Sequence, residues 1–223
     1  MITIRTVPSS EKDQALSKIL ALVEAERDRP GYLYLRDPDF YADFFSDRGM
    51  ITAAWNDGAL IGFLLLGFES TTIEFWHEYI DRMGADPDRC CYGRHALIAP
   101  GYRGIGIGRQ MMIHRSNAAR SLGYHLCFAT THPHNVAIER VYKDSGFVRI
   151  DRRVVFDRQL LRSLWVCRLT QEPTLANATQ IPPSSRSLLT SPDDLTVLNA
   201  ALAPQMAADP QIMADSDLED AHQ

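Results

Sequence analysis

A glycine-rich turn near the middle of the chain is the segment best suited to bind an anion. An apolar stretch ends at Ile98, and Arg103-Gly104-Ile105-Gly106-Ile107-Gly108 then leads directly into a helical pattern. Glycines at alternate positions allow a tight bend that brings backbone N–H groups close to a ligand, and the first turn of the helix adds unpaired donors and a positive dipole end. The pattern predicts a phosphate or pyrophosphate site.

Two other phosphate motifs and a metal site do not fit this sequence. The dinucleotide pattern G-x-G-x-x-G needs a glycine where the chain has Arg109, and no Gly-Lys-Ser/Thr follows the turn. His132 and His134 have no cysteine or carboxylate at ligand spacing, so no metal is expected. The 4 cysteines form no C-x-x-C pair, and their apolar surroundings favour buried, reduced thiols.

Hydrophobic periodicity predicts the elements that position the turn. Strands are expected over residues 2–7, 50–55, 59–68, 91–99, 124–130, 147–156 and 164–169. A first helix is expected from a cap at Ser9 or Ser10 to a point before Pro30, and a short second helix starts at Asp37-Pro38. A third helix is expected over 71–83, where Thr71-x-x-Glu74 forms a capping box. Two more are expected over 108–122, with Met111, Met112 and Ile113 facing inward, and over 135–145. Asn56-Asp57-Gly58 predicts a tight hairpin turn. This order indicates an α/β domain with a mixed sheet.

Charge divides the chain into a body and a tail. The chain has 223 residues and net charge −5, of which residues 171–223 carry −7 and residues 1–170 carry +2. A mildly cationic body without a basic face argues against nucleic-acid binding and suits a polyanionic small molecule. We expect one domain over 1–170 and an acidic tail over 171–223, largely disordered or docked, with a linker at Pro182-Pro183-Ser184-Ser185 and one short helix from Ser191. With no secretory signal and no long apolar run, we expect a cytoplasmic protein without a membrane segment.

Two motifs together resemble those of the GNAT superfamily of N-acyltransferases. The turn from Arg103, after a strand ending Ile98-Ala99-Pro100, is similar to the family's acyl-CoA pattern Arg/Gln-x-x-Gly-x-Gly/Ala. The segment 135–147, which contains Asn135, Tyr142 and Gly146-Phe147, resembles its later motif. The resemblance covers residues 1–170 in element order. It implies a mixed, mostly antiparallel twisted sheet flanked by helices, with a splayed central strand pair.

The resemblance implies acetyl-CoA, or another acyl-CoA, as co-substrate. The turn and its two arginines would bind the pyrophosphate, while backbone groups near Ile98 would bond pantetheine and polarise the thioester carbonyl. The residues expected to bind it are Ile98, Ala99, Arg103, Gly104, Ile105, Gly106, Ile107, Gly108, Arg109, Asn135 and Tyr142. The arginines could equally be surface charges, and Asn135 a simple helix cap.

The resemblance also assigns the acid of the reaction but leaves its base open. Tyr142 would protonate the departing thiolate of coenzyme A, unless it is only a core aromatic residue. The strand before the turn lacks the family's frequent glutamate, so His95 on that strand and Glu69 are the candidate bases. Other candidate bases are Glu74, His77 and Glu78, although each could also be a solvated residue on the surface of a helix.

The helix over 71–83 is the expected acceptor side. Its aromatic residues, Phe75, Trp76 and Tyr79, could line an acceptor pocket, form a homodimer contact or pack on the sheet edge, and its carboxylates Glu74, Glu78 and Asp81 could attract a cationic amine. The sequence therefore predicts transfer of an acyl group, most simply acetyl, from acyl-CoA to a small-molecule or peptide amine by direct attack. A silent acyl-CoA sensor and a protein N-terminal or lysine acetyltransferase are the alternatives.

Overall fold

A computed structural model describes residues 1–27, 36–68, 74–155 and 160–169 of the chain. By Cα proximity the chain divides into two units, Met1–Gln171 and Glu172–Gln223. The acidic tail, with its expected linker and helix, lies outside the described residues, as do Glu69 and Thr71. Within the described ranges, no helix has the length and apolar character needed to span a membrane.

The predicted order of strands and helices is confirmed in the described residues. The strands are β1 (Ile2–Thr6), β2 (Gly49–Asn56), β3 (Ala59–Gly67), β4 (Cys90–Ile98), β5 (Leu126–Thr131), β6 (Val148–Val155) and β7 (Leu160–Arg168). The helices are α1 (Lys12–Glu24), α2 (Pro38–Ala42), α3 (Glu74–Arg82), α4 (Ile107–Ser121) and α5 (Val136–Asp144). β7 begins four residues before the predicted start at Leu164.

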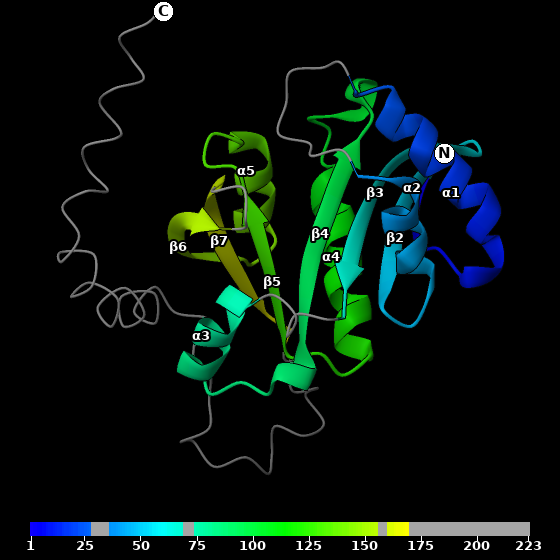
Figure 1. The fold of residues 1–223 in the computed structure, drawn as a ribbon. Helices are drawn as coiled ribbons and strands as arrows, with labels where there is room; N and C mark the ends of the chain where they lie inside the picture. Colours follow the sequence, from blue (N-terminus) through cyan, green and yellow to red (C-terminus); the bar gives the residue numbers. More distant parts are fainter. Residues whose placement is uncertain (28–35, 69–73, 156–159, 170–223) are drawn as a thin grey trace, which may run out of the picture. The chain divides into compact units, whose positions relative to one another are not determined.

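The strands form a single sheet of 7 strands in the order β1-β2-β3-β4-β5-β7-β6. Every neighbouring pair is antiparallel except β4 and β5, which are parallel at the centre of the sheet. Figure 1 shows these two strands meeting at one end and diverging toward the other. This is the mixed, mostly antiparallel sheet with a splayed central pair that the sequence predicted.

Helices cover both faces of the sheet. One apolar cluster joins Met111 and Met112 of α4 and Tyr142 of α5 to Cys91 of β4 and Cys127 of β5. A second cluster joins the helices α1 and α2 to the opposite face of β2 and β3. Successive side chains of a strand point to opposite faces, so Tyr92 and Phe128 lie away from α4, and Trp76 of α3 packs on both. The sheet thus separates an α4–α5 face from an α1–α2–α3 face.

Local turn and cap signals correspond to the structure at four places. Asp57 and Gly58 take φ of 48° and 81° in the β2–β3 hairpin, as a tight turn requires. The Asp37 side chain accepts a hydrogen bond from the Phe40 N–H and caps α2. Gly84 and Gly123, with φ of 58° and 89°, end α3 and α4.

Two local expectations are wrong. Residues 9–11 form a 3-10 turn before α1, and neither serine caps the helix, because the Ser9 hydroxyl donates to the Phe45 carbonyl 2.6 Å away. Ile113 is 40% exposed, whereas Met111 and Met112 are fully buried. Three consecutive residues of a helix span too wide an arc to share one buried face. The four cysteines are all buried, as expected, and burial raises the pKa of Cys90 to about 11.

Candidate active site

The candidate site lies where β4 and β5 stop pairing. Their parallel pairing runs from Cys90 with Leu126 to Gly93 with Ala129 and ends there. Beyond that point, among the described strands, β4 continues to Ile98 paired only with β3. The edge of β4 that faces β5 therefore presents backbone groups without a described strand partner over residues 94–98. We call this stretch the β4–β5 separation.

A β-bulge in β4 begins at the point of separation. Leu64 and Leu66 of β3 pair with Ala96 and Gly93 of β4, so β4 carries one extra residue between them. The bulge places two consecutive side chains on the α1–α2–α3 face: the Arg94 guanidinium lies 4.8 Å from the centre of the Tyr92 ring, and His95 packs on Tyr41. Sequence reasoning missed this bulge, because a register shift depends on the partner strand.

The glycine turn presents a run of unpaired amides. Gly104 and Gly106 have φ of 78° and 87°, and Gly106 is the N-cap of α4. Within the described part of the chain, the N–H groups of residues 104–109 donate no backbone hydrogen bond. Helix α4 begins at Ile107, earlier than the predicted Gly108. The geometry that the sequence predicted for an anion site is therefore present.

Gly108 has a different role from the two glycines before it. A Cβ built on Gly108 would lie 3.1 Å from Cδ1 of Ile98 and 3.4 Å from Cγ2 of Val141. The absence of a side chain therefore lets the first turn of α4 pack closely on both β4 and α5. This packing holds the first turn of α4 against the end of β4 and against α5.

The two arginines of the turn have different surroundings. Arg103 Nε donates to the Ile98 carbonyl at 2.7 Å, and its Nη2 lies 2.6 Å from the carboxylate of Glu26, which is almost buried. Arg103 thus braces the turn and already has a counter-charge. Arg109 is exposed, donates to the Asp144 carbonyl at 3.2 Å, and has no ion pair among the described residues. Arg109 is the one of the two whose charge is available to a phosphate.

The later motif places Asn135 and Tyr142 on α5. Asn135 caps this helix, its Oδ1 accepting from the Ile138 N–H at 3.3 Å. Tyr142 is 4% exposed, packs on Phe147 and Trp165, and its hydroxyl forms no hydrogen bond with any described residue. Burial raises the pKa of Tyr142 above its usual value, opposed by the positive charge of Arg115. The hydroxyl therefore stays protonated at neutral pH and can act as a donor.

His95, the nearer candidate base, belongs to an aromatic cluster. Its Nδ1 lies 3.3 Å from the Tyr41 hydroxyl, and its ring packs on Phe40 with centroids 5.6 Å apart. Burial raises the pKa of Tyr41. His95 is on the bulge and on the face opposite α4 and α5, so a base there would approach an acceptor from the α2 side. The other candidate, Glu69, lies outside the described residues.

The residues of α3 are engaged in packing and ion pairs. Trp76 is fully buried and Tyr79 is 4% exposed, which shows that the helix packs on the sheet. The Glu78 carboxylate lies 2.6 Å from Arg82 and 3.0 Å from Arg153. The hydroxyl of Tyr79 donates to Asp151, and burial together with this bond raises the pKa of Tyr79 to about 12. Glu78 is thus neutralised by two arginines.

A buried arginine lies beneath the point where the strands separate. Arg115 of α4 is 1% exposed, and its Nη2 donates to Met112 Sδ at 2.8 Å and to Cys127 Sγ at 3.9 Å. No described carboxylate pairs with it. A Cβ on Gly93 would meet Arg115 Nη1 at 2.9 Å, so Gly93 provides the space for the guanidinium. A glycine inside a strand is the sequence signal that could have indicated this close approach.

We expect Gly93→Ala to lower the free energy of unfolding by about 1–3 kcal/mol, because a Cβ at residue 93 would lie 2.9 Å from Nη1 and 3.2 Å from Nη2 of Arg115, and the buried guanidinium would have to shift. Arg115→Met should be close to neutral, since it removes a buried charge that lacks a described carboxylate partner. Urea unfolding of the two single variants and the double variant measures their coupling. Strictly additive losses would contradict this contact.

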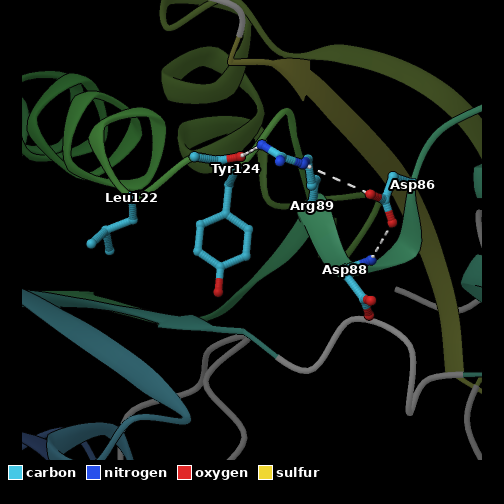
Figure 2. Close-up of a pocket in the computed structure, with 6 residues that line it drawn as sticks. Asp86, Asp88, Arg89, Leu122 and Tyr124 are labelled. Carbon is cyan, nitrogen blue, oxygen red and sulfur yellow. Dashed lines mark hydrogen bonds and ion pairs between the residues drawn. The ribbon is translucent and has the colours of Figure 1, made fainter.

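The described surface also contains a shallow pocket away from these residues. It has a volume of about 360 Å³ and is lined by Asp86, Asp88, Arg89, Leu122, Gly123 and Tyr124. Arg89 donates to the Gly123 carbonyl at 3.3 Å, and its Nε lies 3.7 Å from the Asp86 carboxylate, toward which it points in Figure 2. This pocket lies at the start of β4, whereas the glycine turn follows its end. It contains none of the predicted site residues.

Comparisons with known proteins agree with this architecture. Residues 19–147 match the model of the Acetyltransferase (GNAT) family. No curated protein is significantly similar to the sequence. An N-acetyltransferase from Staphylococcus aureus Mu50 has a similar structure, with 17% identity, TM-score 0.58, and coverage of 76% of this chain and 99% of that one.

Two further solved structures have the same fold. A putative acetyltransferase from Salmonella typhimurium, solved with its cofactor acetyl-CoA, is 16% identical, with TM-score 0.57 and coverage of 78% of this chain and 97% of that one. The ribosomal-protein-S18-alanine N-acetyltransferase from Escherichia coli is 12% identical, with TM-score 0.56 and coverage of 77% and 96%. The family match spans more than half of the chain and includes both motifs. The chain belongs to the GNAT family of acetyltransferases.

Proposed function

We propose that this protein transfers an acetyl group from acetyl-CoA to a primary amine by direct attack of the amine on the thioester. The observation that carries the proposal is the convergence of three features at one place. The parallel pairing of β4 and β5 ends at Gly93 and Ala129, the free amides of residues 104–109 follow the end of β4, and Tyr142 lies on the helix after β5.

Each feature has a role in the proposed reaction. The amides of the glycine turn and the Arg109 guanidinium bind the pyrophosphate, and the unpaired edge of β4 hydrogen-bonds the pantetheine arm. A bulge N–H at residues 94–95 polarises the thioester carbonyl, which stabilises the oxyanion formed when the amine attacks. The C–S bond then breaks, and Tyr142 gives its proton to the departing thiolate.

The proton lost by the amine goes to a base on the opposite face. His95 is placed there by the bulge, next to Tyr41, and can accept a proton directly or through water. Glu69 stays an alternative from the sequence. Because the base and the acid act from opposite faces of the sheet, the amine and coenzyme A enter from different sides.

The test measures binding and chemistry separately. Acetyl-CoA should raise the melting temperature of the full chain, and coenzyme A thiol should be released over a panel of small amines and amino-terminal peptides. Thermal stabilisation without thiol release from any acceptor would favour the acyl-CoA sensor. No stabilisation by acetyl-CoA or free coenzyme A would refute both.

A further inference from the structure

Arginine side chains gather on the face of the sheet from which the amine would enter. Tyr92 lies on this face at the start of the β4–β5 separation, its hydroxyl 3.1 Å from the Thr130 hydroxyl. Burial raises the pKa of Tyr92, and the positive charges of Arg94, Arg162 and Arg36 each oppose this rise. Of these three arginines, Arg94 of β4 lies with its guanidinium 4.8 Å from the centre of the Tyr92 ring, and the charges of Arg162 of β7 and Arg36 before α2 act on the same hydroxyl.

Arg162 has no counter-charge among the described residues. It is half-buried on β7, and it forms no hydrogen bond or ion pair with any described residue. Burial lowers the pKa of its guanidinium. Placing a cation in such an environment costs free energy that a bound anion would recover.

The register of the sheet places a second arginine beside Arg162, which further raises the free energy of its charge. Arg162 of β7 lies directly opposite Arg153 of β6, and like charges at such a pair destabilise a sheet. Arg153 is neutralised by Glu78, 3.0 Å away, and donates to the Tyr79 hydroxyl at 3.3 Å. The Glu78 carboxylate is thus already shared between Arg153 and Arg82.

The neighbouring residues show which face Arg162 occupies. The next residue, Ser163, points to the α4–α5 face, where its hydroxyl donates to Glu139 of α5 at 3.1 Å. Arg162 therefore points to the opposite face, that of Tyr92 and α3. Its charge faces the side from which the amine would approach, and not the side of coenzyme A.

These observations concern the acceptor, and the inference rests on the proposed function. We propose that the amine acceptor carries an anionic group, a carboxylate or a phosphate, and that Arg162 binds this group and so determines acceptor specificity. A guanidinium presents paired donors that match both anions. The sequence alone suggested instead that Glu74, Glu78 and Asp81 attract a cationic amine. Of these three carboxylates, Glu78 is already paired with two arginines.

The test uses matched acceptor pairs on the protein saturated with coenzyme A. Glycine, β-alanine and 4-aminobutyrate are compared with their neutral amides, and O-phosphoethanolamine with ethanolamine, by calorimetric binding. We expect at least one anionic member to bind ten-fold or more tightly than its neutral counterpart. Arg162→Gln should reduce that preference to less than three-fold, and Arg162→Lys should keep part of it.

The control is Arg152→Gln, which removes an exposed arginine of β6 and should leave the preference unchanged. Comparing the carboxylate acceptors with the phosphate acceptor shows which of the two anionic groups Arg162 binds more tightly. A wild-type protein without any preference for the anionic members would overturn the inference, as would a preference that survives in Arg162→Gln. Whether the proposed function fails is measured separately, by the absence of acetyl-CoA binding or of thiol release.

Discussion

Replacing Gly106 with valine is expected to weaken the binding of acetyl-CoA by about 100-fold, which corresponds to about 3 kcal/mol. Gly106 has a φ of 87°, a backbone conformation that a β-branched residue adopts only under strain of about 1–3 kcal/mol. A side chain there would also keep the pyrophosphate from the amides of residues 104–109. Isothermal titration with acetyl-CoA measures the change.

The matched control for this prediction is Gly101→Val. Gly101 belongs to the same connection, in the 3-10 turn Pro100–Tyr102, and has open space around its Cβ position without a positive φ. Its replacement should leave the affinity within about two-fold of the wild type. Equal losses in the two variants would argue against a pyrophosphate on the N-terminus of α4.

Tyr142→Phe is expected to lower kcat by about 100-fold while the Kd for acetyl-CoA stays unchanged. The ring would keep its packing on Phe147 and Trp165. The hydroxyl has no described hydrogen-bond partner, so its removal should not lower the melting temperature. Tyr124→Phe is the control and should retain full activity, because Tyr124 precedes β5 and lines the pocket near the start of β4.

The pH dependence of this effect follows from the direction of the pKa shift. Burial raises the pKa of Tyr142 above its ordinary value of 10.0, so the hydroxyl remains protonated up to that pH and beyond. The ratio of wild-type to Tyr142→Phe kcat should therefore be constant between pH 7 and 9.5. A ratio that falls toward 1 within this range would mean that another group donates the proton.

Much of the fold could be predicted because its signals are local. The hairpin at Asp57 and Gly58, the Asp37 cap of α2 and the glycine that ends α4 each depend on residues within one turn of the chain. The glycine turn belongs to the same class, since a positive φ at Gly104 and Gly106 is a property of the residue type. Such signals, together with hydrophobic periodicity, predicted the order of the elements and the backbone conformation of the glycine turn.

Three features of the candidate site could not be predicted, because they depend on segments far apart in the sequence. The bulge at residues 94–95 exists only relative to β3, and it alone places Arg94 and His95 on one face. Gly93 inside a strand could indicate a close approach, but the identity of the approaching side chain, Arg115 of α4, depends on how the two elements pack. The lack of a described counter-charge at Arg162 depends on Arg153 taking the carboxylate of α3.

By itself, the sequence determined the α/β class, the two motifs and the backbone geometry of the glycine turn, since these follow from residue conformations and hydrophobic periodicity. Only the tertiary structure decided which charges are already paired. It ties Arg103 to Glu26 and leaves Arg109 available, and it neutralises Glu78 while Arg162 has no partner among the described residues. The physical reason is that ion pairing and burial act through space, and the sheet register brings these side chains together from distant parts of the chain.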